Sequence, residues 1–531
     1  MSDRPILAFG IMTDNHLDPA YPELAERTRA AFRLFRRFDP DLLIDAGDIT
    51  DFWQPEELEH FDAMFRETFP GKRPETLWLL AGHDVTRHPA YWGAYPEGMA
   101  LIGMEDTIPV RRVNGFYFVG VFQCGDYAEF EKRLKKAVAD SPGQPVFAVT
   151  HRPASGTVLR SDYSGDRELF EIFRKYPSVI QISGHTHTPI FHDRNIWQGE
   201  FTAFNAGSLT YWKDITFGRE SRRHQSHDAL FCRLYENRLE IARFDVMSEK
   251  EVASPWEIPL PFDEKTAPYR PLQRKNELPV AELPAAAPVR FSDEGFGVLT
   301  IRNAVPFSVL QRYRVTLFED ERELSVMDFY PGTWPETAGE NGEKFYFPPG
   351  MLQSGGSYRC LVVPMNHFDS GGKAAELHFS APDVKLAELP VRGIAGVFAG
   401  DTPIPVAPDG TFSVDARYPY GYRIVPPPEL IPYYSRPVVM VCDFSCRHAG
   451  RPAVLMACGE RPDYGRHYFP SGEEKKHRHC FDLSALRGDR RCLLLCEGEA
   501  GQYRIENVRY FTYPSQIQRA QNEKGDPGRE K

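Results

Sequence analysis

Five short segments of the 531-residue chain place carboxylate and imidazole side chains in a fixed order. They are Asp14-Asn15-His16, Gly47-Asp48-Ile49-Thr50-Asp51, Gly82-His83-Asp84, His151 and Gly184-His185-Thr186-His187. A single Asp or His after a strand is usually a turn residue or a helix cap. No packing requirement explains the whole series. Carboxylates and neutral imidazoles suit Mn, Fe and Zn, so the series predicts a metal centre.

The chemistry that needs such a residue set is phosphate-ester hydrolysis. Two divalent ions about 3.5–4 Å apart clamp the attacking and leaving oxygens of a phosphoryl displacement. They also lower the pKa of a bound water towards about 7, which gives a hydroxide at neutral pH. A carboxylate is the natural bridge between the ions, because each of its oxygens can bind one of them.

Each segment follows a short apolar run, a pattern typical of strands buried on both faces. The runs are 5–13, 41–46, 76–81, 145–150 and 179–183, and helical spacing occurs at 22–38, 55–69 and 128–138. Alternating strands and helices predict an α/β layered domain. Ligands bind at the carboxyl ends of strands in such sheets. We therefore expect all five segments to converge on one edge of one sheet. Strand alternation further predicts that the side chains of His185 and His187 point the same way, onto one metal centre.

The order and spacing of the segments resemble the calcineurin-like metallophosphoesterases, from the N-terminus to about residue 260. The resemblance implies a four-layer metallophosphoesterase β-sandwich flanked by helices. It also implies two divalent metals. The implied ligands are Asp14, His16 and His187 for the first metal, His151 and His185 for the second, and Asp48 as the bridge.

The same resemblance assigns four further residues. His83 matches the acid that protonates the leaving oxygen, and Asp84 matches the residue that orients it. Asp51 supports the site from behind the ligands. Asn205 begins an Asn-Ala-Gly-Ser turn that often follows in bacterial members, and it is placed in the same supporting set.

One position departs from the family pattern, which reads Gly-Asn-His-Asp/Glu after the third strand. Here Gly82 stands where the Asn ligand of the second metal is expected. Three explanations are open. Water or substrate fills the position and leaves a weaker second site, which we favour because the other ligand positions are intact. Another side chain enters from a loop, or the protein is a degraded phosphatase.

Arginines near the motifs are candidates for binding the substrate phosphate, since guanidinium groups bind phosphate in bidentate fashion. Arg222 and Arg223 lie in a basic stretch at 211–228, and Arg152 follows His151 directly. The alternative is that the stretch is a solvated loop.

The rest of the chain divides by composition. We predict the first domain over 1–260, a Pro-rich linker over 261–288, all-β domains over 289–382 and 388–514, and a disordered tail over 515–531. The first β domain resembles fibronectin type III and the second resembles galactose-binding jelly rolls. A glycan partner at the second domain is therefore one hypothesis, with Tyr418, Tyr420, Tyr422, Tyr433 and Tyr434 as candidate contacts.

Composition limits the other classes. The formal net charge of −11 gives no electrostatic footprint for nucleic acid. The N-terminus lacks a signal-peptide pattern and no apolar run is long enough to cross a membrane, so we expect a cytoplasmic protein with no membrane partner. The nine cysteines are expected to be mostly buried free thiols.

The sequence therefore predicts a metal-dependent hydrolase of phosphate esters, either a phosphatase or a nucleotide or cyclic-nucleotide phosphodiesterase. The alternative is a non-catalytic protein that keeps the fold and binds a glycan or protein partner. Gly82 favours that alternative, whereas His83 and Asp84 argue against it.

Overall fold

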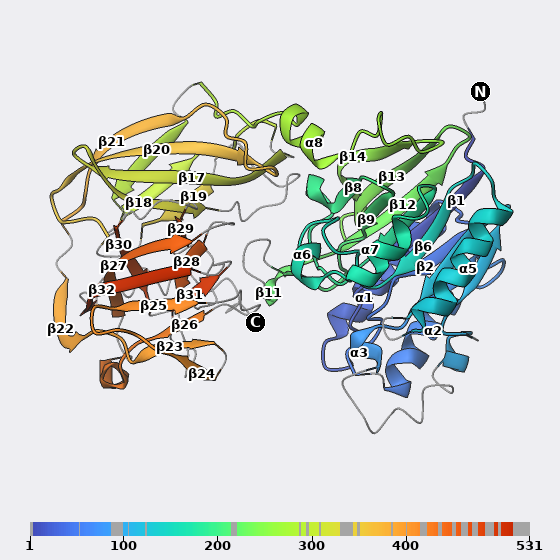
Figure 1. Ribbon diagram of the computed structural model, residues 1–531, viewed down its shortest axis with the longest axis horizontal. Helices are drawn as coiled ribbons and strands as arrows, with labels where there is room; N and C mark the ends of the chain where they lie inside the picture. The colour runs from blue at the N-terminus through green and yellow to red at the C-terminus, as the bar shows by residue number, and fades with distance from the viewer. Residues whose placement is uncertain are drawn as a thin grey trace. The chain divides into compact units, whose positions relative to one another are not determined.

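The computed structural model forms two compact units, Met1–Leu278 and Pro279–Lys531, each treated by itself (Figure 1). The structure describes residues 4–52, 54–85, 99–104, 106–122, 125–213, 220–285, 288–293, 297–306, 309–329, 343–347, 351–383, 386–399, 401–414, 422–433, 438–448, 453–457, 466–469, 476–483, 493–496 and 501–512. No helix among these residues is both long and apolar enough to cross a membrane.

The first unit contains two six-stranded sheets. One has the order β14-β13-β12-β1-β2-β3, formed by β1 (Leu7–Met12), β2 (Leu42–Asp45), β3 (Glu75–Trp78), β12 (Asp228–Leu234), β13 (Arg238–Asp245) and β14 (Lys250–Pro259). The other has the order β4-β5-β6-β7-β9-β8, formed by β4 (Val110–Val113), β5 (Phe116–Val121), β6 (Val146–Thr150), β7 (Val179–Ser183), β8 (Ile196–Gln198) and β9 (Thr202–Asn205).

The strands that carry the motifs are those predicted from the apolar runs, but they do not share a sheet. β1, β2 and β3 are parallel neighbours in the first sheet, and β6 and β7 are parallel neighbours in the second. The prediction that all five segments meet at one edge of one sheet is therefore wrong. The physical reason is the antiparallel pairing of β12 with β1, which completes the first sheet with late segments of the chain.

The two sheets pack against each other through aromatic side chains. The ring of Phe9 on β1 lies 5.2 Å from the rings of Phe118 on β5 and Phe147 on β6, measured between centroids. On the opposite face of β1, a Cβ at Gly10 would meet Phe35 of α1 at 2.7 Å, so helix and strand approach closely there.

The helices expected at 22–38, 55–69 and 128–138 are present as α1 (Pro22–Arg37), α2 (Pro55–Thr68) and α5 (Tyr127–Asp140). The remaining elements of the unit are α3 (Gly82–Val85), α6 (Ser161–Ser164), α7 (Arg167–Phe173), η2 (Asp193–Asn195), β10 (Tyr211–Lys213), β11 (Glu220–Gln225) and α8 (Pro271–Glu277). Helix α8 lies within the predicted linker, where Arg274 forms a 2.9 Å ion pair with Asp193.

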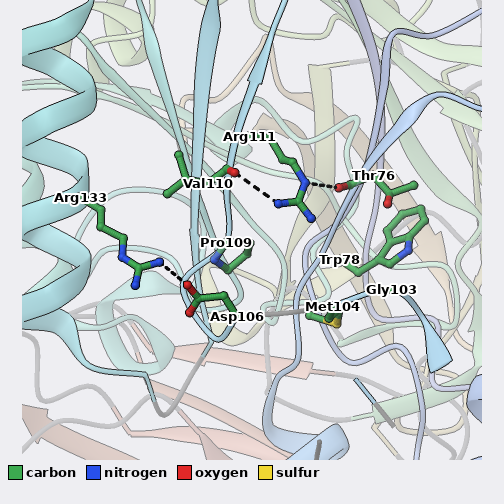
Figure 2. A pocket seen from close by; sticks show the side chains of 9 residues that line it. All are labelled: Thr76, Trp78, Gly103, Met104, Asp106, Pro109, Val110, Arg111 and Arg133. Atoms are coloured by element: carbon green, nitrogen blue, oxygen red, sulfur yellow. Dashed lines mark hydrogen bonds and ion pairs between the residues drawn. The ribbon is translucent and has the colours of Figure 1, made fainter. Parts of the chain in front are cut away.

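Side chains join the edge strands of the two sheets, β3 and β4 (Figure 2). Arg111 of β4 donates from Nε to the carbonyl of Thr76 on β3 at 3.1 Å. Arg133 of α5 donates to the carbonyl of Ile108 at 2.6 Å and pairs with Asp106. A cavity of about 220 Å³ lies among these residues. An edge strand leaves backbone groups unpaired. We therefore infer that Arg111 satisfies one such carbonyl on β3 and links the edge strands of the two sheets.

The second unit is built of strands, and its described residues contain no α-helix. Its ten-stranded sheet has the order β21-β20-β17-β18-β29-β28-β31-β26-β23-β24, formed by β17 (Leu310–Glu319), β18 (Arg322–Phe329), β20 (Ser357–Asn366), β21 (Ala375–Ser380), β23 (Gly396–Ala399), β24 (Thr402–Ile404), β26 (Tyr422–Val425), β28 (Ala453–Ala457), β29 (Arg466–Phe469) and β31 (Leu493–Cys496). The smaller sheets use β15 (Val289–Asp293), β16 (Gly297–Ile301) and β19 (Glu343–Tyr346), and β22 (Ala387–Arg392), β25 (Thr411–Val414), β27 (Val438–His448), β30 (His477–Asp482) and β32 (Gly501–Thr512). A 3₁₀ helix, η4 (Pro428–Tyr433), precedes β27.

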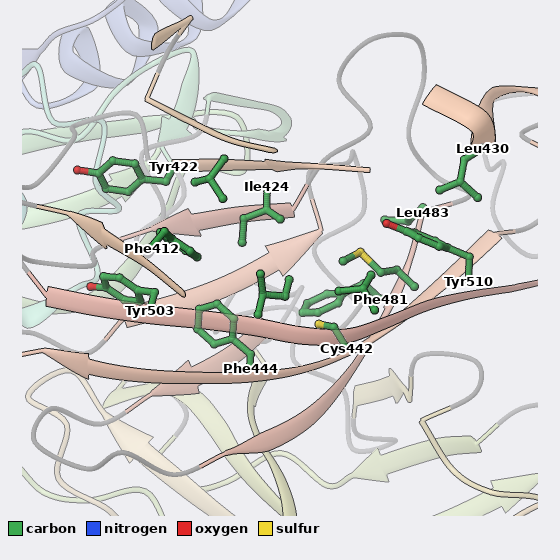
Figure 3. Close-up of a cluster of buried hydrophobic side chains, with 14 of the residues drawn as sticks. Phe412, Tyr422, Ile424, Leu430, Cys442, Phe444, Phe481, Leu483, Tyr503 and Tyr510 are labelled. Carbon is green, nitrogen blue, oxygen red and sulfur yellow. The ribbon is translucent and has the colours of Figure 1, made fainter. Parts of the chain in front are cut away.

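The ten-stranded sheet runs across both predicted β domains, because Met327 of β18 pairs with His467 of β29. The division at 382–388 therefore stays a prediction. The core beneath β27 and β32 includes Phe412, Phe444 and Tyr503 (Figure 3).

Tyr422 belongs to this core and is 5% exposed, so it is unavailable to a glycan, and Tyr433 packs partly buried against the same cluster. Tyr418, Tyr420, Tyr434 and the tail 515–531 lie outside the described residues.

The expectation of buried free thiols is confirmed for the five cysteines whose side chains the structure describes. These are Cys232, Cys360, Cys442, Cys446 and Cys480.

Candidate metal centre

The five motif segments meet where the carboxyl ends of β1, β2, β3, β6 and β7 come together. Several hydrogen bonds join segments from the two sheets. The amide of His185 donates to Asp14 Oδ2 at 3.0 Å, and Nδ1 of His151 lies 3.0 Å from the Ala46 carbonyl. The hydroxyl of Thr210 donates to the carbonyl of Asp14. The carboxyl ends of strands from two sheets thus form one site.

Backbone strain is concentrated at this site. Twelve non-glycine residues of the described chain have positive φ, and five of them are candidate ligands. These are Asp14 (54°), His16 (45°), Asp48 (56°), His185 (68°) and His187 (48°). The left-handed conformation costs roughly 1–2 kcal/mol for an L-residue. Such strain persists only where surrounding structure enforces it, and it gathers at functional sites.

Two glycines allow the loops to approach each other. Gly47 has φ of 106°, and a Cβ there would lie 2.7 Å from Ala81 Cβ. A Cβ at Gly184 would lie 2.6 Å from Asp14 Oδ2 and 2.1 Å from the Thr13 hydroxyl. A larger residue at either position would push the ligand loops apart.

One cluster of candidate ligands consists of Asp14, His16 and His187, all buried. Nε2 of His187 lies 2.8 Å from Asp14 Oδ1 and 3.4 Å from Nε2 of His16. Nε2 of His16 lies 3.8 Å from Asp14 Oδ1 and 3.9 Å from Asp48 Oδ2. Two nitrogen or oxygen ligands of one ion, each about 2.1 Å away from it, stand roughly 3–3.5 Å apart. The cluster is therefore close to the size that one cation needs.

A second cluster consists of Asp14, Asp48 and His151 and shares Asp14 with the first. Nε2 of His151 lies 3.2 Å from Asp48 Oδ2 and 3.9 Å from Asp14 Oδ1. The ring of His185 lies 5.1 Å from that of His151, measured between centroids. His187 therefore belongs to the first cluster, and the ring of His185 lies beside the second. Both residues follow β7 in the left-handed conformation, so strand alternation does not apply to them.

Each of three histidines directs one ring nitrogen away from the clusters. Nδ1 of His151 lies against the Ala46 carbonyl at 3.0 Å, and Nδ1 of His187 lies 2.9 Å from the Tyr211 carbonyl. Nδ1 of His16 lies 3.3 Å from Asp51 Oδ1. A ring N–H held by a carbonyl or carboxylate fixes the tautomer of a metal-binding histidine. The three Nε2 atoms are left to face the clusters.

The two carboxylates and the imidazole of His151 hold opposite charges in the metal-free protein. Burial alone would raise the pKa of Asp14, but His187 and His151 lower it. Burial would likewise raise the pKa of Asp48, but His151 and His16 hold it well below its ordinary value. Burial would lower the pKa of His151, but Asp48 and Asp14 raise it to about 9. The carboxylates are thus ionised and ready for a cation.

His83 lies beside the clusters and is held by Asp51. Its Nδ1 is 2.7 Å from Asp51 Oδ1, and its backbone N–H donates to Asp48 Oδ1 at 2.9 Å. Burial would raise the pKa of Asp51, but contacts with His16 and His83 lower it. The side chains of His83 and Asp51 are 22% and 19% exposed, whereas Asp14, His16 and Asp48 are 5% exposed or less.

Asp84 has a different position from the one that the resemblance implied. Its carboxylate accepts from the amides of Thr50 and Ala81, each at 2.9 Å, and from the hydroxyl of Thr50 at 2.8 Å. Burial and the nearby Asp48 raise its pKa to about 6. Asp84 therefore joins the loops after β2 and β3, and Asp51 is the carboxylate in contact with the imidazole of His83.

Asn205 supports the loop that carries His185 and His187. Its amide donates to the Gly184 carbonyl at 2.5 Å, and its Oδ1 accepts from the Gly207 amide at 3.0 Å. Gly82 begins the short helix α3, directly before His83.

Of the arginines, Arg152 is half-buried, and its charge acts on the phenol of Tyr127. Arg222 and Arg223 lie on strand β11, and their side chains are outside the described residues.

Sequence reasoning missed several residues around the site. The side-chain amide of Asn15 donates to Asp45 at 2.7 Å. Asn15 belongs to the first motif and Asp45 to the apolar run before the second, but the contact between them was not predicted. Tyr211 stacks on His187 with 4.3 Å between ring centroids. No spacing rule links Tyr211 to the histidines; its place three residues after the Asn-Ala-Gly-Ser turn was the available signal.

The donor set fits a pair of divalent cations. Asp14 Oδ1 and His151 Nε2 are buried without a well-directed hydrogen bond in the described structure, although His187 Nε2 lies 2.8 Å from the first and Asp48 Oδ2 lies 3.2 Å from the second. A cation between such atoms would satisfy both. The donors are carboxylate oxygens and imidazole nitrogens, which suit Mn, Fe and Zn.

Comparison with known proteins finds one matching family model and several similar solved structures. A model of the calcineurin-like phosphoesterase family matches residues 7–189, and no curated protein shows a significant sequence match. Similar solved structures include a dimetal phosphatase from Danio rerio, with 13% identity, 48% of this chain and 99% of that chain covered, and a TM-score of 0.35. The purple acid phosphatase PPD1 from Lupinus luteus has 12% identity, 48% and 53% coverage, and a TM-score of 0.35. Plasmodium GAP50 has 12% identity, 53% and 98% coverage, and a TM-score of 0.34.

The Asp and His residues at the ends of β1, β2, β6 and β7 lie within the matched segment. Residues 7–189, which lie in the unit Met1–Leu278, are thus similar to the calcineurin-like phosphoesterases.

Proposed function

We propose that this domain hydrolyses phosphate esters with the help of two divalent ions. The observation that carries the proposal is the pair of buried Asp/His clusters that share Asp14, with the partly exposed His83 beside them. The ligands proposed for the ions are Asp14, His16, Asp48, His151, His185 and His187.

Such a pair of ions, when bound, supplies Lewis-acid activation of water and of the phosphoryl oxygens. The residues of the chain do the rest. Doubly protonated His83 gives the proton on Nε2 to the leaving oxygen, and the Asp51 carboxylate, which accepts from Nδ1–H, stabilises that charged form of the ring. The contact of the His83 amide with Asp48 keeps this acid at a constant distance from the ligands. The exposure of His83 and Asp51 leaves room for the leaving group on that side.

We propose that Arg152, Arg222 and Arg223 hold the phosphate group of the substrate. Support comes from position alone: β11 pairs with β10, which begins at Tyr211, and the Tyr211 carbonyl contacts His187. Replacement of both Arg222 and Arg223 by Ala is expected to raise KM. An unchanged kcat/KM in the double variant would show that β11 is a solvated surface strand that does not bind the phosphate.

The test of activity uses metal-stripped protein titrated with Mn²⁺. Hydrolysis of bis(p-nitrophenyl) phosphate or p-nitrophenyl phosphate should appear with the metal and fall roughly 10²–10⁴-fold in His83→Ala. The preferred ester separates a phosphodiesterase from a phosphatase. Turnover without metal, or turnover that survives His83→Ala unchanged, would contradict the proposal.

Gly82 supports a second candidate, a binding or scaffold protein that retains the fold. The missing ligand weakens the binding of the second ion, and catalysis can be lost as a consequence. This candidate predicts metal binding without turnover of either ester. A glycan bound by the second unit would then be the readout, with Tyr433 as the remaining described aromatic candidate.

For the architecture, we propose the four-layer arrangement in the first unit. It is supported by the Phe9 contacts between the sheets and by the close approach of α1 to Gly10. We also propose two β-sandwiches in the second unit, similar to fibronectin type III and galactose-binding modules. Limited proteolysis near 382–388 would test that division.

A further inference from the structure

Tyr211 contacts two histidines of the first cluster at once. Its ring is nearly parallel to that of His187, at 4.3 Å and 29°, and to that of His16, at 5.8 Å and 26°. Its carbonyl also accepts from Nδ1 of His187 at 2.9 Å. One residue thus holds His187 by both a stack and a hydrogen bond, and it restrains the plane of a second imidazole.

The segment that leads to Tyr211 is itself fixed to the first cluster. The amide of Leu209 donates to the Thr13 carbonyl at 3.1 Å, and the hydroxyls of Ser208 and Thr210 both reach the carbonyl of Asp14. From the other side, the buried guanidinium of Arg27 on α1 donates to the carbonyls of Leu209 and Thr210. Tyr211 therefore follows a segment that is held at several points, and it begins β10, where it pairs with Gln225 of β11.

We propose that Tyr211 is a positioning residue for the first metal site, acting through the imidazoles of His16 and His187. The inference rests on the proposed function, because it assumes that these histidines hold a divalent ion. It concerns affinity for the ion and is independent of any step of hydrolysis.

The physical reason is that imidazoles must present Nε2 in a fixed direction to bind an ion. The stack prevents both rings from rotating about their Cβ–Cγ bonds. Polarisation of an imidazole by a bound cation also makes the ring more electron-poor, which favours contact with an aromatic face. Contacts behind the ligands typically change metal affinity about 10–100-fold when they are removed.

The experiment measures Mn²⁺ binding to full-length metal-stripped protein by calorimetry and by EPR of free Mn²⁺. Tyr211→Leu removes the ring but keeps the backbone carbonyl. We expect the Kd of the tighter site to rise about 10-fold or more, with the weaker site unchanged. Tyr211→Phe keeps the stack and should bind as wild type does. Equal weakening in Tyr211→Phe and Tyr211→Leu would assign the effect to the hydroxyl and overturn the proposal.

Trp212→Leu is the matched control on the neighbouring residue. Its indole donates to the buried Asp228 at 2.9 Å, so its loss should lower the melting temperature of the metal-free protein without changing either Mn²⁺ constant. An unchanged tighter site in Tyr211→Leu would refute the inference while leaving the proposed function intact. A wild-type protein that binds no Mn²⁺ would instead refute the proposed function.

Discussion

At the scale of single residues, the most informative position is Gly82, where the family pattern has a metal-binding Asn. We predict that Gly82→Asn tightens the second metal site by at least about tenfold, because contacts around a bound ion commonly change affinity by that factor. The first site should be unaffected, since its donors are Asp14, His16 and His187. Calorimetric titration with Mn²⁺ measures both constants.

Gly82→Ala is the control for that change, because it adds a side chain without a donor atom. If Gly82→Asn and Gly82→Ala have the same Kd for Mn²⁺ at the second site, the missing amide is irrelevant and another group completes the site. If the wild-type second site is already as tight as the first, the weak-site explanation is wrong.

A second prediction at this scale separates Asp51 from Asp84. Asp51→Asn should lower kcat about as much as His83→Ala, because Asp51 holds the imidazole that acts as the acid. The double variant should lose little more, since residues that act as a unit are not additive. Asp84→Asn should lower the melting temperature instead, because the Asp84 carboxylate accepts bonds from the loops after β2 and β3. Additive losses in Asp51→Asn/His83→Ala would show that the two side chains act independently.

At the scale of elements, the strands and helices that carry the motifs could be predicted from the sequence, because buried strands read as apolar runs and α1, α2 and α5 keep helical spacing. The division of the motifs between two sheets and the backbone conformation at the ligands could not be predicted, because they depend on contacts between residues far apart in the sequence. Pairing of β12 with β1 divided the motifs between two sheets. The left-handed backbone at His185 and His187 broke the alternation that a strand would have imposed.

The start of α2 gives a prediction about pH. Glu57 accepts from the amides of Phe52 and Gln54, and its burial raises its pKa to about 7. The unfolded chain ionises Glu57 near its ordinary pKa of about 4.3. As pH rises from about 4.3 to 7, the unfolded state therefore releases its proton first and the folded state loses relative stability. Gln does not ionise. The free energy of unfolding of Glu57→Gln should therefore rise relative to that of wild type across this pH window and stay constant above it.

We expect a gain of roughly 1–2 kcal/mol between pH 5 and pH 8 after allowance for solvent screening, measured by urea denaturation of the metal-free protein. Glu56→Gln is the matched control in the same helical turn, because Glu56 is exposed. A pH-independent difference between Glu57→Gln and wild type would mean that Glu57 is ionised at little cost in the folded protein.

At the scale of the whole molecule, composition predicted folded domains and an all-β C-terminal half, and the described residues agree. The ten-stranded sheet could not be predicted, since it depends on pairing between β18 and β29, which are far apart in the chain. The end of the first unit at Leu278 lies beyond the predicted 260 because α8 forms inside the Pro-rich stretch, where Arg274 pairs with Asp193.

Separation of the sheets leads to the last prediction. Strands β1 to β14 pair only among themselves in the described sheets, and β15 to β32 do the same. Every candidate ligand, His83 and Asp51 belong to the first group of elements. A fragment of residues 1–278 should therefore fold, bind Mn²⁺ at both sites and hydrolyse the p-nitrophenyl esters within about threefold of the full chain, as expected of a unit with its own core.

Circular dichroism and the Mn²⁺ titration distinguish the two ways in which this prediction can fail. A fragment that does not fold would show that the second unit stabilises the first. A folded fragment with altered metal constants would show that the second unit acts on the metal centre. Normal constants combined with lost activity would place part of the substrate contact beyond Leu278, and the β-rich unit would then be part of the catalytic apparatus.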